Sequence, residues 1–150
     1  MARERLYGPT IVQAFLDEGM DPALGLAIAR QESAFRADSV CTTGGDGARG
    51  GSYGLMQMSL MTARTLGFIG PAKGLLAPGV NAGLAAALCK SNSARSKQIF
   101  DLAAMYNSGK VLAKAPKVTA TKYVPAVLRY YEEYKARYFA GEFAKKSTST

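Results

Sequence analysis

Residues 21–35 have the sequence DPALGLAIARQESAF, which predicts a helix with clear signals at both ends. Asp21 followed by Pro22 is a strong helix start, because the aspartate side chain can cap free amides and proline fits the first helical position. The residues that follow are nearly all apolar or small, so the helix is predicted to be largely buried. It is expected to end between Ser33 and Phe35, which places Glu32 in its last turn.

Glu32 is the only acidic residue of this predicted helix. Burial disfavours a carboxylate, and so does the negative end of the helix dipole, so both should raise its pKa. A carboxyl group that stays protonated near neutrality can protonate a leaving-group oxygen. From position alone, however, a solvated glutamate at a helix end explains Glu32 better, so a catalytic role needs support from the surrounding residues.

The rest of the chain has mainly helical periodicity. A first helix is expected from Pro9 to Gly19, and its apolar face comprises Ile11, Val12, Phe15 and Leu16. The glycine-rich residues 38–54 predict a loop or a short hairpin. Four helices should follow: one capped by Ser59 and stopped by Gly67, and others over about 79–92, about 96–106 and from 121 onward.

No repeat or linker divides the chain, so residues 1–150 are interpreted as a single, mainly α domain with a disordered tail at 145–150. No stretch approaches the roughly 20 apolar residues of a membrane span. No apolar segment follows the charged N-terminus, so no secretory signal is visible.

Composition excludes several classes of enzyme. The chain contains no histidine, which rules out Ser-His-Asp and Cys-His catalysis and His-ligated zinc. It has no phosphate-binding glycine motif, so a nucleotide enzyme is not expected, nor is any cofactor or metal. The net charge of +8 favours an anionic partner such as nucleic acid, anionic lipid or cell wall. Nine Lys/Arg lie between Lys110 and Lys146, although a merely solvated face explains them equally well.

The two cysteines, Cys41 and Cys89, are too few for a structural zinc site. They could form one disulfide in an oxidising compartment, or they could be two thiols. The absence of a visible secretory signal favours the thiols.

Five short motifs support a catalytic role for Glu32. They are ARQESAF (29–35), GSYGLMQ (51–57), L-x-P-x-x-N-x-G (76–83), MYNSG (105–109) and Y-V-x-x-V (123–127). In this order, over residues 24–131, they resemble the landmarks of the SLT lytic transglycosylases of the goose-type-lysozyme-like class. The sequence departs from that pattern at Met58-Ser59-Leu60, where the family usually has an apolar residue and Met-Pro, and at Met105, where it has alanine.

The resemblance implies a lysozyme-like fold of about six helices, with the glycine-rich segment 38–54 beside the substrate cleft. It implies cleavage of the β-1,4 bond between N-acetylmuramic acid and N-acetylglucosamine without water, leaving a 1,6-anhydro ring. Glu32 would act first as acid and then as base. The hydroxyl of Tyr106 is expected to reach the Glu32 carboxyl, and Ser33 to brace the helix end. The substrate-binding residues would be Ser52, Met56, Gln57, Tyr106, Asn107 and Tyr123.

Two other functions stay open. A hydrolytic muramidase would need a second carboxylate, and the loop after Glu32 offers only Asp38 and Asp46. Asp46 could reach across the cleft, but a turn residue is the simpler interpretation. A basic module that binds nucleic acid or cell wall without catalysis would use the C-terminal third, with Tyr130, Tyr131 and Tyr134, but would not explain the ordered motifs.

The expected partner is therefore the glycan of bacterial peptidoglycan, attacked by a monomer acting on the cell wall, in the periplasm or from a phage particle. The small size and missing signal favour a bacteriophage lysis or virion enzyme. A secreted bacterial enzyme without its leader would show the same features.

Overall fold

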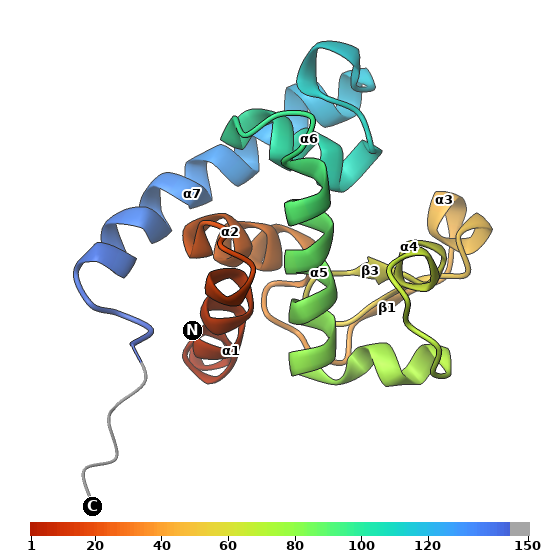
Figure 1. Ribbon diagram of the computed structural model, residues 1–150, viewed down its shortest axis with the longest axis horizontal. Coiled ribbons are helices and arrows are strands. Elements are labelled where there is room, and N and C mark those ends of the chain that lie inside the picture. Colours follow the sequence, from red (N-terminus) through yellow and green to blue (C-terminus); the bar gives the residue numbers. More distant parts are fainter. Residues whose placement is uncertain (145–150) are drawn as a thin grey trace, which may run out of the picture.

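The computed structural model describes residues 1–144, so the tail expected to be disordered, 145–150, lies outside the described residues. Most of this part is helical, and a small sheet lies to one side of the helices (Figure 1). This confirms the predicted mainly α fold with a small hairpin. The elements in chain order are α1 (Ala2–Asp17), α2 (Pro22–Ser33), β1 (Val40–Cys41), α3 (Gly44–Ala48), β2 (Ser52–Tyr53), β3 (Met58–Ser59), α4 (Leu60–Thr65), the 3-10 helix η1 (Ala72–Leu76), α5 (Pro78–Asn92), α6 (Ile99–Ser108), the 3-10 helix η2 (Leu112–Lys114), the π-helix η3 (Thr119–Tyr123) and α7 (Val124–Phe139).

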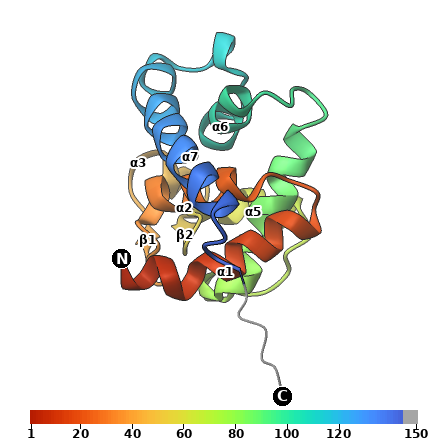
Figure 2. The same ribbon diagram turned by 90° about the vertical axis from the view of Figure 1, so that its left-hand side faces the viewer.

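Helix α2 is the buried centre of the molecule. Every residue from Pro22 to Ala29 is buried, and α1, α5, α6 and α7 all contact the helix. Helix α7 runs alongside it, and α1 crosses beneath (Figures 1 and 2). The close approach of α1 requires glycine at Gly25, because a Cβ there would lie 2.7 Å from the ring of Phe15.

Both ends of α2 form as the sequence predicts. The Asp21 carboxylate accepts a hydrogen bond from the Ala23 amide at 2.9 Å, and Pro22 occupies the first turn. The helix ends at Ser33, after which Ala34 and Phe35 both adopt the left-handed conformation, with φ of 52° and 62°. These two residues turn the chain sharply away, leaving Glu32 in the last turn.

The first helix is longer than predicted. It begins at Ala2 and contains Pro9, and Leu16 is 46% exposed rather than part of the buried face. Proline interrupts the helical hydrogen-bond ladder, so the preceding turns need stabilisation from elsewhere. Glu4 supplies it, because its buried side chain is bonded to α7.

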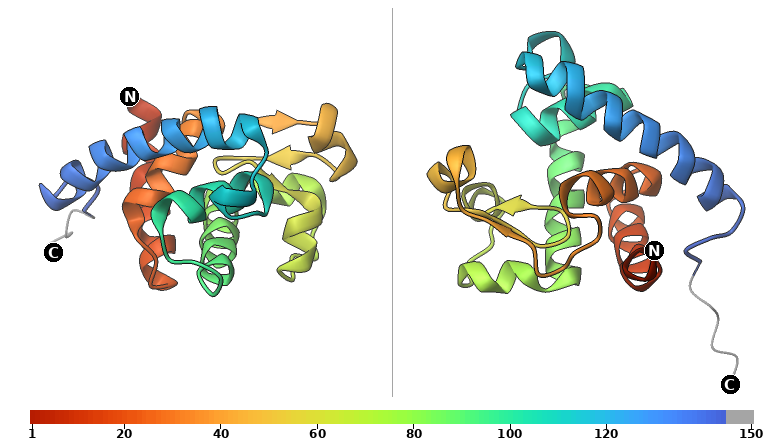
Figure 3. Two further views of the ribbon diagram at one scale, coloured as in Figure 1. Left: turned by 90° about the horizontal axis from the view of Figure 1, so that it is seen from above. Right: turned by 180° about the vertical axis from the view of Figure 1, so that it is seen from behind.

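The glycine-rich segment forms more structure than a hairpin. Strands β1, β2 and β3 make an antiparallel sheet in that order, with Val40 opposite Tyr53 and Ser52 opposite Ser59. The short helix α3, which was not predicted, lies in the connection between β1 and β2 (Figure 3). The predicted short helix after Ser59 is present as α4, with the Ser59 hydroxyl accepting from the Thr62 amide at 3.1 Å.

The disulfide considered for Cys41 and Cys89 is not formed, and both residues are free thiols. Cys89 is buried in α5, whereas Cys41 lies on β1 with its sulfur 3.8 Å from the Thr43 hydroxyl. Burial raises the pKa of the Cys89 thiol to about 12, so this residue behaves as a small apolar side chain of the core.

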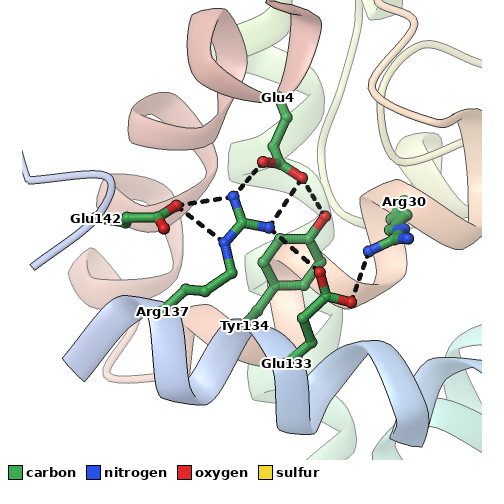
Figure 4. Close-up of polar contacts among 6 residues, drawn as sticks. All are labelled: Glu4, Arg30, Glu133, Tyr134, Arg137 and Glu142. Carbon is green, nitrogen blue, oxygen red and sulfur yellow. Dashed lines mark hydrogen bonds and ion pairs between the residues drawn. The ribbon is translucent and has the colours of Figure 1, made fainter. Parts of the chain in front are cut away.

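A charged cluster fastens α7 to α1 (Figure 4). The guanidinium of Arg137 donates to both carboxylate oxygens of the buried Glu4, and the Tyr134 hydroxyl donates to the same carboxylate at 2.5 Å. Burial alone would raise the pKa of Glu4, but these hydrogen bonds and the charge of Arg137 outweigh it and lower that pKa. The contacts with Arg137 and Tyr134 thus offset the cost of burying the negative charge of Glu4.

The same cluster extends to α2 through Arg30. Glu133 of α7 accepts from Arg30 at 2.9 Å, and Arg137 also contacts Glu133 (Figure 4). Arg30 stands two positions before Glu32 in the sequence. The cluster therefore fixes α7 and the second half of α2 relative to each other.

We expect Arg137→Met to lower the free energy of unfolding by about 3 kcal/mol, because it leaves the Glu4 carboxylate buried without its cation. Urea denaturation at neutral pH measures this loss. Since the pKa of Glu4 is lowered in the fold, the stabilisation is present above its unfolded value near 4.5 and disappears as the pH falls through the folded value. Glu142→Gln is the control, because its exposed ion pair with Arg137 should contribute under about 1 kcal/mol. Equal losses in both variants would contradict the assignment.

Candidate active site

A pocket lies at the C-terminal end of α2, between the small sheet and α6. Glu32 lines it, together with side chains from six other parts of the chain. The remaining lining residues are Asp46, Arg49, Ser52, Gln57, Met58, Ser59, Thr62, Leu88, Tyr106 and Asn107. Its lining is mostly polar, with Leu88 and Met58 as apolar patches.

The carboxyl of Glu32 is held from behind by Tyr123. The Tyr123 hydroxyl donates to Glu32 Oε1 at 2.7 Å, across 91 residues of sequence. Burial raises the pKa of Glu32, the Tyr123 hydrogen bond lowers it, and the negative charge of Asp46 raises it, with a net result of about 7. Burial and the Glu32 charge also raise the pKa of Tyr123 well above its ordinary value, so the phenol stays a donor. Glu32 can therefore both give and take a proton near neutral pH.

The backbone of Leu55 and Met56 connects three helices beneath the pocket. The Ser33 hydroxyl, at the end of α2, donates to the Leu55 carbonyl at 2.7 Å. Asn81 of α5 accepts from the Met56 amide at 2.7 Å. The Tyr106 hydroxyl of α6 donates to the Met56 carbonyl at 2.6 Å. We call residues 54–57 the central loop, because helices α2, α5 and α6 are all tied to it.

Two positions of the central loop have left-handed backbones. Gly54 has φ of +79°, and a Cβ there would lie 2.6 Å from the Asn81 amide nitrogen, so only glycine fits. Gln57 has φ of 47°, which is uncommon for a residue with a side chain. The nitrogen of its side-chain amide donates to the backbone carbonyls of Ser39 and Gly54, at 3.1 and 3.0 Å, and these bonds stabilise the turn.

Asp46 belongs to the pocket, which corrects its interpretation as a turn residue. It lies on α3, and its carboxylate accepts from the Ser52 hydroxyl at 2.9 Å. Because α3 folds over the end of the sheet, Asp46 lines the same pocket as Glu32, and its charge acts on that residue. Asp38, the other acid of this segment, is exposed and is not among the lining residues.

Comparison with known proteins identifies the family. The family model described as the transglycosylase SLT domain matches residues 9–123. The chain belongs to the SLT transglycosylase family. Among solved structures it is similar to the lytic transglycosylase Slt of Pseudomonas aeruginosa, determined as an inactive mutant with glutamine in place of a glutamate. The TM-score is 0.70 and the identity 25%, over 91% of this chain but only 25% of that one. None of the curated protein sequences compared with the chain matches it.

Within this SLT domain, two expectations about the site do not hold: the place of Met56 and the contact of the Tyr106 hydroxyl with Glu32. The side chain of Met56 is fully buried in the core, so it cannot form a wall of the groove; Met58, two residues later, lines the pocket instead. The Tyr106 hydroxyl is bonded to the Met56 carbonyl, and the expected contact with the Glu32 carboxyl is made by Tyr123. The spacing of residues along the sequence does not predict which side chains face the pocket at the irregular turn around Gln57.

The other predicted residues gather at or next to the pocket. Ser52, Gln57 and Asn107 line it, although each also has a partner in the protein. Asn107 accepts from the Thr119 hydroxyl at 2.7 Å, and Ser52 is bonded to Asp46. Tyr123 is almost completely buried and acts through Glu32. Ser33 is buried at the helix end, where it also accepts from the Arg36 amide at 3.1 Å.

Several lining residues were not predicted as site residues. Arg49 follows α3, Thr62 belongs to α4 and Leu88 to α5, and none of the three was expected to bind substrate. Only the helical spacing of Leu88, four residues after Leu84 on a helix expected to be central, offered a signal. Their positions follow from the packing of α4 and α5 around the central loop.

Neither a metal centre nor a membrane helix is found within residues 1–144. No three His, Cys, Asp or Glu side chains there lie together as metal ligands would. None of the helices in that range is both long and apolar enough to cross a bilayer.

Two substitutions should move the pKa of Glu32 in opposite directions. Tyr123→Phe removes a hydrogen bond that favours the carboxylate, so the pKa should rise above about 7. Asp46→Asn removes a neighbouring negative charge, so the pKa should fall. Infrared difference spectroscopy of the carboxyl band against pH measures both, and Glu32→Gln identifies the band. Shifts in the same direction would contradict the assigned contacts.

Proposed function

We propose that this SLT domain is a lytic transglycosylase that cleaves the glycan strands of bacterial peptidoglycan, with Glu32 as the catalytic acid and base. The observation that carries the proposal is the position of the Glu32 carboxyl, which lines a polar pocket and accepts a hydrogen bond from Tyr123, while burial raises its pKa to about 7. Membership of the SLT transglycosylase family and the similarity to Slt support the substrate class. The chain matches only about a quarter of Slt, and we propose the same substrate and activity for it on the grounds given above.

In the proposed reaction, protonated Glu32 first donates its proton to the oxygen between N-acetylmuramic acid and N-acetylglucosamine. As that bond breaks, the acetamido oxygen of the muramic acid stabilises the positive charge at the anomeric carbon. Glu32, now a carboxylate hydrogen-bonded by Tyr123, then removes the proton from the C6 hydroxyl as its oxygen attacks that carbon. The products are a free N-acetylglucosamine hydroxyl and a 1,6-anhydro ring, and Glu32 has regained its proton.

Polar side chains around Glu32 suit this substrate. Gln57 and Asn107 each present amide groups that can bind acetamido and hydroxyl groups of a sugar. The C6 hydroxyl is part of the sugar that it attacks, so the reaction is intramolecular and has an entropic advantage over attack by water. One carboxyl group therefore suffices for both proton transfers.

Hydrolysis by a muramidase mechanism is the second candidate, and the position of Asp46 favours it. Asp46 lines the pocket together with Glu32, and a carboxylate in such a position can activate water. Its hydrogen bond from Ser52 keeps it oriented. In the transglycosylase proposal the same charge has a different effect, since it keeps Glu32 protonated near neutrality.

Glu32→Gln should reduce glycan cleavage by about 10²- to 10⁴-fold, because glutamine cannot transfer a proton. Release of soluble muropeptides from purified sacculi measures the activity. The variant should be at least as stable as the wild type at pH 8, where the buried carboxylate is otherwise charged. Glu132→Gln, on the exposed side of α7, is the matched control and should keep full activity. More than a tenth of wild-type activity in folded Glu32→Gln would refute the assignment.

The products should end in 1,6-anhydro-N-acetylmuramic acid. Such a product is lighter than the hydrolytic one by one water and has no reducing end for borohydride to reduce, so mass spectrometry with and without borohydride distinguishes the two. Asp46→Asn should leave the anhydro product as the only one, at an altered pH optimum. If the wild type instead releases only reducible ends and Asp46→Asn abolishes their release, the enzyme is a hydrolase.

A further inference from the structure

Residues 110–122 form a surface segment that carries positive charge and no negative charge. Its four lysines are Lys110, Lys114, Lys117 and Lys122, and no acidic residue occurs between Gly109 and Tyr123. All four are exposed. The ion pairs found among residues 1–144 involve arginines only, so none of these ammonium groups is paired there. We call this segment the lysine cap.

The lysine cap is attached directly to the candidate active site. Thr119 donates to Asn107, which lines the pocket, and Tyr123, the next residue after the cap, donates to Glu32. In Figure 1 the segment lies beyond the end of α6, at the outer side of the molecule. Through these two hydrogen bonds the cap adjoins the part of the pocket that α6 lines.

The backbone of the cap is held in place. The Leu112 amide donates to Asp101 of α6 at 2.8 Å, and Arg95 donates to the Gly109 carbonyl at 3.0 Å. The other Asp101 oxygen accepts from Ser96 at 2.7 Å, so both oxygens of this carboxylate already have a hydrogen-bond partner. Four like charges on one short, fixed segment repel each other, and an anionic ligand would relieve that repulsion.

We propose that the lysine cap binds the carboxylates of the peptide stems on the glycan strand whose sugar ring occupies the pocket. This inference rests on the proposed function. The stems branch from muramic acid, one of the two sugars of the bond to be cleaved, so their carboxylates are carried next to the pocket. Lysine suits such a ligand, because its flexible side chain and compact charge adapt to carboxylates at variable positions. The cap thus makes strands with stems better substrates than bare strands.

The test compares two variants with equal net charge. Lys110→Gln, Lys114→Gln, Lys117→Gln and Lys122→Gln are combined in the cap variant. The control variant combines Arg5→Gln, Lys73→Gln, Lys90→Gln and Lys135→Gln, four exposed positions outside the cap. Each variant loses four positive charges from the net +8. kcat/KM is measured on soluble glycan strands with stems and on strands stripped by an amidase, both from sacculi freed of teichoic acid.

The wild type and the control variant should prefer strands with stems by roughly fivefold or more, as expected from a few exposed ion pairs, and 0.5 M salt should reduce that preference. The cap variant should lose the preference while cleaving stripped strands at the wild-type rate. Equal behaviour of the two variants would overturn the inference, and so would a preference that survives in the cap variant. In both cases continued cleavage of stripped strands leaves the proposed function intact.

A binding measurement tests the lysine cap independently of the proposed lytic activity. If the wild type cleaves neither substrate, the proposed function fails, and co-sedimentation with sacculi still tests the cap. Weaker sedimentation of the cap variant alone, seen with sacculi that carry stems and absent with stripped ones, supports the inference. A loss that appears only when teichoic acid is present, or only with DNA, shows that the cap binds another polyanion and overturns it.

Discussion

The hydrogen bonds to the backbone of Leu55 and Met56 are the constraint on which the rest of the site depends. Side chains from α2, α5 and α6 reach the same two peptide units, which are buried and would otherwise lack partners. A buried amide or carbonyl without a partner is costly, so each of these bonds stabilises the arrangement by more than its own small net contribution. Any change that shifts this loop must move the end of α2, and Glu32 with it.

This constraint explains why the motifs of the sequence occur together. Ser33, Asn81 and Tyr106 come from three different motifs, and each uses its side chain to hold the central loop, which is a fourth. A motif shows that a residue type is required at a position, but not whether it touches the ligand or the protein. For that reason the motifs lead to the residues around the pocket, whereas the buried position of Met56 and the bond of the Tyr106 hydroxyl to the Met56 carbonyl were not predicted.

Short sequence signals predicted the helix starts, ends and caps that depend on neighbouring residues. The Asp21-Pro22 start of α2 and its end near Ser33, the Ser59 cap and the helices α5 and α6 were predicted from neighbouring residues, within a few positions. The features that were missed depend on distant contacts. Helix α1 extends past Pro9 because Glu4 meets Arg137, 133 residues later. Asp46 reaches the pocket only because α3 folds over the sheet.

The chemistry of Glu32 is also set by distant parts of the chain. Tyr123 and Asp46 act on one carboxyl with opposite signs, and neither effect overrides burial. A group balanced in this way responds to modest changes in either neighbour. An acid and a base in one residue need this balance, because a strongly shifted carboxyl would perform one of the two roles poorly.

The π-helix η3 has a further consequence for the register of the chain. Thr119 and Tyr123 are both buried and point inward, one to Asn107 and the other to Glu32. A π-turn accommodates one more residue than an α-turn, and each helical residue advances the direction of its side chain by about 100°. A single-residue deletion here would relax the turn to an α-helix and place Thr119 three positions before Tyr123 instead of four, which would change the angle between the two side chains. The length of this one turn, as well as the identity of its residues, therefore keeps Thr119 directed at Asn107 and Tyr123 directed at Glu32.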